Sequence, residues 1–465
     1  MKTTERINDQ VSEINALDKR HHLHPWTHFD SFDRDGAMVI ARGQGAHLED
    51  GYGQEYLDSV GGMWCTNVGL GRSEMAQAIA DQVEELAYAS SFVDMTNGPA
   101  ARLGAKLAEL TPGDLNHVHF TTCGSTAIDS AYRMQAFYWA CVGRPEKHQV
   151  IARHQSYHGS TFIGMSVGNR ADDRAPEFQY KTDGIHHLSA PYEYRAPNGM
   201  SGTAFTDFLV AEFEEKIAEI GADHIGAFFA EPVMGSGGVI VPPEGYIRRM
   251  WEVCQKHNIL FVADEVVTAF GRLGHWFASE AEFGIVPDMI TCAKGITSGY
   301  LPLGATLFSD RMYEGMQGDP GRWFTSGYTY SGHPVCSAAA LKNIEIIERE
   351  GLLQNAAEVG AYFEEQLGSL RDLDIVGDVR GKKLMMCVEN VQNKETKELF
   401  PYEVNIGKRI SDAAEKGGLI VRPIGHLNVM SPPLTLTKQD VDFLVGVLGE
   451  AISSVTRDLK SQGLL

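Results

Sequence analysis

ILFVADEVVTAFGR (residues 259–272) and MITCAKGITSGYLPLG (residues 289–304) decide the fold that we predict for this chain. Each stretch opens with a short apolar run and then turns polar, the first at Asp264 and the second at Lys294. Apolar runs without polar alternation are typical of strands buried on both faces of a mostly parallel sheet. The ligand crevice of such a sheet lies at the carboxyl ends of its strands. We therefore expect Asp264 and Lys294 to lie in one crevice.

Similar apolar runs alternate with helical patterns between about residues 76 and 334. The further runs are HVHF (117–120), QVIAR (149–153) and IGAFFA (225–230). Between them, for example in 125–143, apolar residues recur at spacings of three and four, as on one face of a helix. This alternation predicts the α/β fold class, with a mostly parallel central sheet and helices on both faces.

The two ends of the chain predict a second, smaller α+β domain. The C-terminal part mixes helical patterns with short strands around LIVRP and LNVMSPPL. We assign residues 76–334 to the large domain, and residues 1–75 together with 335–465 to the small one. The large domain is then inserted between the two parts of the small domain.

Composition excludes several classes of protein. The 465 residues include 40 Lys and Arg against 61 Asp and Glu, a net charge of −21 without a basic cluster, which argues against nucleic-acid binding. Seven scattered cysteines without a C-x-x-C pair are typical of a reducing compartment. We find no secretory signal and no run of about 18 apolar residues that would span a membrane. We expect a soluble, cytoplasmic protein that binds neither nucleic acid nor membranes.

Lys294 and Asp264 each have a simple and a chemical interpretation. A lysine at a strand end is most simply a snorkelling side chain, but an amine partly removed from water also forms a Schiff base with a carbonyl. A carboxylate there is most simply a cap or an ion-pair partner, but it also keeps a pyridine nitrogen protonated. Val266, two residues along an extended chain, points the same way as Asp264 and packs either against a ring or into the core.

The segment Cys123-Gly124-Ser125 begins a helix directly after a strand. Ser125 is most simply the N-cap, yet small residues at a helix N-terminus also leave amide groups free for a phosphate. The glycines of 235–238 lack the third glycine of the dinucleotide fingerprint, and no Walker motif is present. Tyr157 follows another strand and is either a half-buried loop residue or a ring that stacks on a planar cofactor. Together the four features predict pyridoxal 5'-phosphate (PLP).

Over nearly its whole length the sequence resembles the class III, fold-type-I PLP-dependent aminotransferases of the ω-amino acid/amine:pyruvate group. The segments that carry the resemblance are DSVGGMWCTNVGLGR (58–72), FTTCGSTAID (120–129), YHGST (157–161), AEPVMGSGG (230–238), ADEVVTAFGR (263–272), AKGITSGYLPLG (293–304), GYTYSGHP (327–334) and GLIVRPIG (418–425). The pair ADEVVTAFGR and AKGITSGYLPLG is the most specific of these.

The resemblance implies a role for each matching residue. Lys294 is the Schiff-base lysine and carries the proton, and Asp264 pairs with the pyridine nitrogen. The other implied cofactor positions are Gly124, Ser125, Tyr157, His158, Glu231, Val266 and, reaching the neighbouring subunit, Thr329. The implied substrate positions are Trp26, Trp64, Tyr157, Arg422 and, from the neighbouring subunit, Tyr88. The resemblance thus implies a homodimer with shared active sites, and leaves a tetramer open.

Three departures from the family pattern stand out. Thr126 and Ile128 replace the acid and the amide of S-G-S-E-A-N, which changes side-chain contacts at the phosphate helix but not its backbone amides. Ser326 replaces a His, and His426 stands where an Asp commonly follows the R-x-x-G stretch, so the electrostatics around Arg422 differ.

The resemblance implies an aminotransferase that moves an amino group from an ω-amino acid or primary amine to pyruvate, giving alanine. The donor class stays open among taurine, β-alanine, polyamine and arylalkylamine types. Two alternatives also remain: another PLP reaction, such as that of an aminomutase or decarboxylase, and a non-catalytic PLP-fold binding protein.

Four N-terminal histidines raise the question of a metal, namely His21, His22, His24 and His28. We see no carboxylate or cysteine spaced to complete a site, so we expect structural or solvated histidines and no metal.

Overall fold

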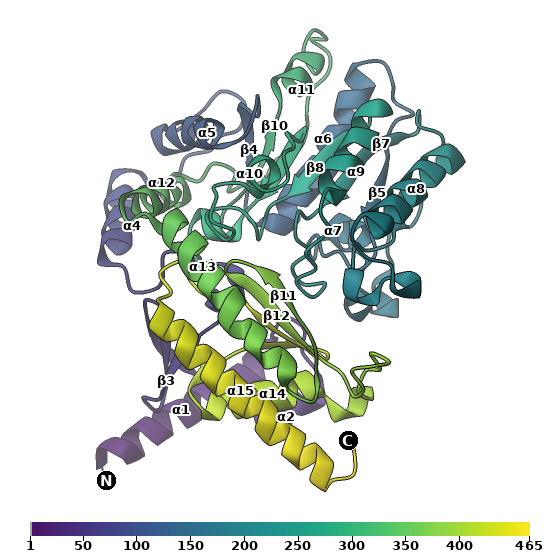
Figure 1. Ribbon diagram of the computed structural model, residues 1–465. Helices are drawn as coiled ribbons and strands as arrows, with labels where there is room; N and C mark the ends of the chain where they lie inside the picture. Colours follow the sequence, from purple (N-terminus) through teal and green to yellow (C-terminus); the bar gives the residue numbers. More distant parts are fainter. Residues whose placement is uncertain (1) are drawn as a thin grey trace.

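A computed structural model describes residues 2–465 of the chain (Figure 1). Its centre is a seven-stranded sheet with the order β4-β10-β9-β8-β7-β5-β6. The strands are β4 (His117–Thr121), β5 (Gln149–Arg153), β6 (Ile185–Leu188), β7 (Ile225–Ala230), β8 (Leu260–Asp264), β9 (Met289–Cys292) and β10 (Gly304–Phe308). Only β10 runs antiparallel to its neighbours in this sheet of the described chain. The predicted mostly parallel α/β sheet is confirmed.

Helices cover both faces of this sheet, which is why its central strands are apolar throughout. Phe229 of β7 joins the core beneath α6 (Gly124–Cys141). Its neighbour Phe228 points to the opposite face, where it packs with α8 (Gly202–Ile220) and α9 (Tyr246–Lys256). Successive strand residues face opposite sides, so a strand between two helical layers needs apolar residues at every position.

Two strands of the large sheet lack the pattern that predicts the others. β6 is IHHL and lies at the sheet edge, where one side of the strand has no neighbour and polar residues are tolerated. β10 is GATLF and pairs antiparallel between β4 and β9. Neither has the long apolar run of a central parallel strand, so neither was predicted.

The two ends of the chain form two smaller sheets. One contains β1 (Ile40–Gln44), β2 (His47–Asp50), β3 (Glu55–Asp58) and β13 (Leu419–Ile420). The other contains β11 (Val376–Lys382), β12 (Met385–Asn390), β15 (Leu427–Met430) and β14 (Arg422–Ile424). β13 pairs in parallel with β3, with Leu419 opposite Leu57, so the N-terminal and C-terminal parts share one sheet. The boundaries at residues 75 and 334 remain a prediction.

Helices from both ends pack around these small sheets. In Figure 1 the purple α1 and the yellow α15 are both found in the lower part of the molecule. The remaining helices are α1 (Lys2–His21), α2 (Phe29–Asp35), α3 (Gly61–Trp64), α4 (Ser73–Leu86), α5 (Gly98–Leu110), α7 (Phe162–Val167), α10 (Ala278–Ala281), α11 (Asp310–Gly315), α12 (Pro334–Arg349), α13 (Leu352–Gly368), α14 (Ile406–Lys416) and α15 (Lys438–Ser461). Among the described residues, no helix combines the length and apolar character that crossing a membrane requires.

Arg272 connects the large sheet to both smaller parts. It is fully buried, and its guanidinium donates to the carbonyls of Leu384 and Pro432 and to the side-chain oxygen of Asn67. Burial lowers the Arg272 pKa to about 10. These contacts join the chain just after β8 to the segments that cover the carboxyl ends of the strands.

Candidate active site

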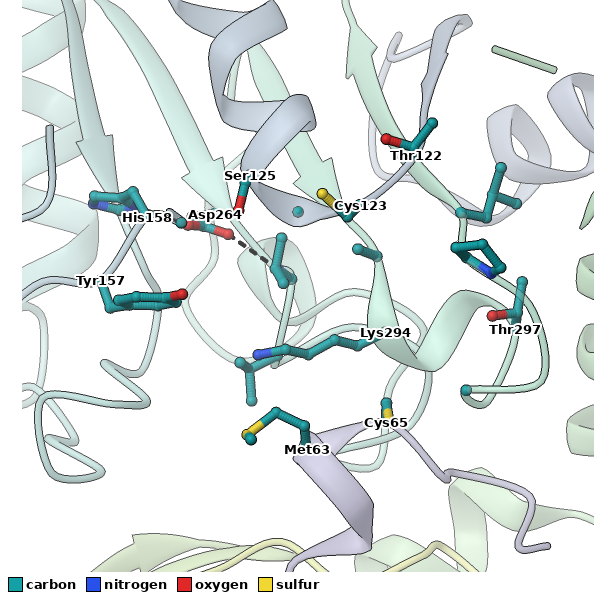
Figure 2. A pocket seen from close by; sticks show the side chains of 18 of the residues that line it. Met63, Cys65, Thr122, Cys123, Ser125, Tyr157, His158, Asp264, Lys294 and Thr297 are labelled. Carbon is teal, nitrogen blue, oxygen red and sulfur yellow. Dashed lines mark hydrogen bonds and ion pairs between the residues drawn. The ribbon is translucent and has the colours of Figure 1, made fainter. Parts of the chain in front are cut away.

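A cavity of about 480 Å³ lies at the carboxyl ends of β8 and β9 (Figure 2). Eight of the residues predicted from the sequence line it: Gly124, Ser125, Tyr157, His158, Glu231, Asp264, Val266 and Lys294. They come from five segments that are far apart along the chain. The parallel sheet brings them together because its strands end at the same edge.

Lys294 follows β9 by two residues and begins a short 3-10 turn, η5 (Lys294–Ile296). Its backbone has a φ of +47°, a left-handed conformation that is uncommon for a residue with a side chain. The ammonium lies 5.7 Å from the centre of the Trp64 ring, and in Figure 2 the side chain extends across the cavity. Burial lowers the Lys294 pKa from 10.5 to about 8, while the charge of Asp264 opposes that shift. The amine is therefore far more nucleophilic near neutral pH than an exposed lysine.

Asp264 ends β8 and is held by three hydrogen bonds. Its Oδ2 lies 2.7 Å from His158 Nδ1, and its Oδ1 accepts from Thr291 Oγ1 and from the Val266 amide, each at 3.2 Å. Only 4% of the side chain is exposed. This carboxylate is fixed in place and faces the cavity.

Val266 lies beside Gly124, where a β-carbon added to the glycine would come within 2.9 Å of Val266 Cγ1. The expectation that Val266 continues an extended chain is wrong, because the strand ends at Asp264 and a turn includes Val266. The close approach to the start of α6 places the valine at the cavity.

The amino end of α6 forms one corner of the cavity. Cys123, not Ser125, is the N-cap, and Thr126 completes a capping box in which its Oγ1 accepts from the Cys123 amide at 3.0 Å. Thr126, which stands where the family pattern has an acid, thus makes a capping contact. Ser125 Oγ instead accepts from the Ser160 amide at 3.0 Å. The Thr126 amide is used in this box, and the amides of Gly124 and Ser125 ahead of it in this 18-residue helix are the ones that suit a phosphate.

The loop after β5 approaches this corner closely. Gly159 has a φ of +116°, and a β-carbon there would lie 2.6 Å from Ser125 Cα. Only glycine fits this approach. The loop carries Tyr157, whose hydroxyl lies 2.9 Å from Ser160 Oγ and whose ring borders the cavity in Figure 2. Burial raises the Tyr157 pKa.

Glu231 fixes the loop that carries Tyr157. Its Oε1 accepts from the Tyr157 amide at 3.1 Å, and its Oε2 accepts from the Gly235 amide at 2.8 Å. Burial raises the pKa of this carboxyl. Glu231 therefore orders the backbone on the Tyr157 side of the cavity.

The predicted substrate residues are placed less uniformly. Trp26 lies outside the cavity, with its ring 6.1 Å from that of Tyr157 and its Nε1 donating to Asp173 at 3.0 Å. Trp64 is 2% exposed and packs near Lys294, whereas its neighbours Met63 and Cys65 line the cavity. Sequence reasoning missed these two neighbours, because the family resemblance implied only Trp64 in this segment.

Arg422 lies next to the cavity at the start of β14. Its guanidinium contacts Met63 Sδ, and Met63 lines the cavity. Burial lowers the Arg422 pKa, and the charge of Arg170 lowers it further. His426 turns to another partner, with its Nε2 3.5 Å from the buried Glu389 carboxylate.

Tyr88 and Thr329 are together but are not among the cavity-lining residues of the same chain. The Tyr88 hydroxyl donates to the Thr329 carbonyl at 2.9 Å, and Tyr88 is 45% exposed. Of the other departures, Ile128 is a fully buried core residue. Ser326 lies with Phe92 at a separate surface hollow.

Sequence reasoning also missed the floor of the cavity, formed by Thr297 and residues 299–303. These follow Lys294 directly and lie within the quoted AKGITSGYLPLG segment. The signal was their proximity to the lysine, but which side chains face the cavity depends on how the turn folds.

The N-terminal histidines do have a carboxylate partner, so the expectation that no carboxylate is suitably spaced is wrong. Asp18 lies 2.9 Å from His22 Nδ1 and 3.0 Å from His24 Nε2. The helix places residues four apart on one face, a spacing that joins Asp18 to His22. His28 instead acts as the N-cap of α2.

These groups fit the phosphate, ring and aldehyde of one cofactor. The free amides of α6 suit a phosphate, Asp264 suits a ring nitrogen, and the lowered pKa of Lys294 suits reaction with an aldehyde. The glycines at 124 and 159 leave room for close approach. A sheet of this topology with such a site defines a PLP-dependent enzyme of fold type I.

Comparison with known proteins specifies the family. Residues 31–452 match the class-III aminotransferases. The chain is 38% identical over 440 residues to the putrescine–pyruvate aminotransferase of Pseudomonas aeruginosa, covering 94% of this chain and 95% of that protein. It superimposes with a TM-score of 0.92 on an (S)-enantioselective omega-transaminase from Thermomicrobium roseum, at 40% identity and with 96% and 98% of the two chains covered. A PLP-bound amine transaminase from an uncultivated Pseudomonas species gives a TM-score of 0.90 at 40% identity, with 94% and 99% covered.

The chain therefore belongs to the class-III aminotransferases. It is an enzyme that uses PLP, an amine donor and a keto-acid acceptor. The interpretation as a non-catalytic binding protein is thereby excluded.

Proposed function

We propose that this aminotransferase moves an amino group from a primary amine or an ω-amino acid to pyruvate, giving alanine. The observation that carries the choice of acceptor is the half-buried Arg422 beside the cavity. A planar guanidinium suits a keto-acid carboxylate, which is costly to bury without a partner. The names of two relatives, which specify putrescine with pyruvate and an omega-transaminase, support the proposal.

The other residues have distinct tasks in this proposal. PLP, when bound, supplies an electron sink for the charge that develops at the carbon bearing the amino group. When PLP is bound, Lys294 would hold its aldehyde, and the Lys294 amine would serve as the base that moves a proton at the carbon bearing the amino group. Asp264, oriented by His158, would keep the ring nitrogen protonated. The first amides of α6 and the Ser125 side chain would hold the phosphate.

The aromatic side chains near the cavity set the donor class in this proposal. Tyr157 borders the cavity, and the Trp26 ring lies 6.1 Å from the Tyr157 ring. The Tyr157 ring suits alkylamine and arylalkylamine chains, and Trp26 lies next to that ring outside the cavity. A donor without a carboxylate leaves Arg422 free, while pyruvate engages it in the second half of the cycle.

We further infer a homodimer in which each subunit completes its neighbour's site. Tyr88 and Thr329 are hydrogen-bonded to each other, and neither lines the cavity of its own chain. They lie in a region where several large apolar side chains are exposed, among them Phe92, Trp323 and Tyr330. Burial of such a patch against a second copy stabilises a dimer. All seven cysteines are free, which supports a reducing, cytoplasmic location.

A donor panel with pyruvate as acceptor tests the proposed function. The purified enzyme is mixed with putrescine, β-alanine, taurine, 4-aminobutyrate or an arylalkylamine, and alanine is measured. Alanine should form with at least one donor and not with the Lys294→Ala variant. An enzyme that releases carbon dioxide or isomerises the donor without forming alanine would instead be a decarboxylase or aminomutase.

A further inference from the structure

The end of α1 and the residues just beyond it bring two histidines and a carboxylate together outside the active site. Asp18, His22 and His24 each offer a ligand atom, and these atoms all lie within 4.8 Å of one another. The side chains of Asp18 and His24 are 19% and 29% exposed, and that of His22 is 68% exposed. The cluster is thus partly sheltered and still open to solution on one side.

We propose that Asp18, His22 and His24 bind a divalent transition-metal ion of the Zn²⁺ type. Two imidazole nitrogens and one carboxylate oxygen are a ligand set that Zn²⁺ accepts, with water in the remaining position. Ligand atoms about 2.1 Å from a tetrahedral ion lie roughly 3.4 Å from one another. The two histidine–carboxylate distances of 2.9 and 3.0 Å need to widen only slightly to admit the ion.

The local structure holds these ligands in position. Asp18 lies in the last turn of α1. His22 directly follows the helix, and its amide donates to the Asp18 carbonyl at 2.9 Å, which continues the helical turn. His24 lies just beyond the helix, where its ring packs at 4.6 Å from that of Phe32 and its carbonyl accepts from Thr27 Oγ1.

Binding at this cluster would also affect the active site. Trp26 follows His24 by two residues and has a φ of +54°. Its indole nitrogen donates to Asp173 at 3.0 Å, and its ring lies near Tyr157. An ion that links α1 to His24 restrains the segment that brings Trp26 to the wall beside the cavity.

Titration of the PLP-loaded enzyme with ZnCl₂ in a calorimeter tests the site without measuring turnover, so its outcome is independent of the proposed reaction. The Asp18→Asn and His22→Ala variants should each bind one Zn²⁺ fewer per chain, or bind it at least about tenfold more weakly. Mutation of a residue that only hydrogen-bonds to a metal ligand already lowers metal affinity by about tenfold or more, so loss of a ligand should cost at least as much. His21→Ala is the matched control, because His21 is an exposed neighbour on the same turn but is not part of the cluster.

Hydrogen exchange of peptides that cover residues 18–28 gives a second readout. Zn²⁺ should slow exchange in this segment in the wild-type enzyme and in His21→Ala, but not in His22→Ala. Equal Zn²⁺ binding by the wild type and both cluster variants would overturn the proposal. So would an equal loss in His21→Ala, or exchange that Zn²⁺ leaves unchanged.

Discussion

The Lys294 amine should react with electrophiles near neutral pH much faster than an exposed lysine does. Burial lowers its pKa from 10.5 to about 8. Because each pKa unit changes the neutral fraction tenfold, about 300 times more of this amine is neutral at pH 7 than at the usual pKa. The neutral form is the nucleophile, so reactivity rises as the pH increases through about 8 and is lost as the pH falls below it.

Competitive acetylation measures this property directly. The PLP-free enzyme is treated briefly with acetic anhydride over a range of pH, and mass spectrometry follows the peptide that contains Lys294. The rate should have its midpoint near pH 8. A midpoint at about 10 or above, the range of an ordinary lysine, would refute the reasoning.

The Asp264→Asn variant tests in which direction the Asp264 charge shifts the Lys294 pKa. The Asp264 charge raises the Lys294 pKa and so opposes the effect of burial. Its removal should lower the midpoint further and increase labelling at pH 7. Lys147 is an internal control, because burial also lowers its pKa to about 8 but Asp264 is not among the charges that act on it. An upward shift at Lys294, or an equal shift at both lysines, would contradict this account.

Four further outcomes follow from the site. Asp264→Asn should reduce kcat/KM by about 100-fold or more, roughly 3 kcal/mol, since the ring nitrogen loses a charged partner; near-normal turnover would mean that the wrong acid is assigned. Gly159→Ala should weaken PLP binding and lower the free energy of unfolding by about 1–3 kcal/mol, because the new β-carbon meets Ser125 at 2.6 Å. Gly53→Ala, which has a φ of +86° but open space around it, should leave PLP binding unchanged. Arg422→Ala should raise the KM for pyruvate about tenfold or more, a loss of roughly 1.5–3 kcal/mol of binding free energy. The single-turnover reaction with an alkylamine should change little. Equal slowing of both half-reactions would mean that the arginine has only a structural role. Activity should disappear when dilution separates the dimer, as followed by light scattering, and active monomers would refute the shared site.

The sequence by itself was sufficient to predict those site residues that directly follow an apolar run in the chain. Asp264 and Lys294 each end an apolar run, and buried parallel strands place such residues at one edge of the sheet. The start of α6 after β4 was readable for the same reason. Local patterns were therefore enough to predict five of the seven strands of the large sheet and the main cofactor-site candidates.

Adjacent residues show where that local information stops. Asp264 and Glu265 look equivalent in the sequence, but Asp264 faces the cavity. Glu265 is buried on the other side, where it accepts from the amides of Ala278 and Ser279 at 2.7 and 2.8 Å. Val266 reaches the cavity from a turn that extended-chain reasoning missed. The direction of a side chain at a strand end depends on where the backbone leaves the sheet.

Only the tertiary structure decided which distant segments meet. The antiparallel β10, the β3–β13 pair and the choice of Met63 over Trp64 at the cavity all depend on packing between segments far apart in the chain. Asp18, His22 and His24 are close together in the sequence. Their contact still depends on the folded chain, because it requires both the end of a helix and the bend that follows it. Periodicity reports which side of an element is buried, whereas the partner on that side is fixed by long-range contacts that no local pattern contains.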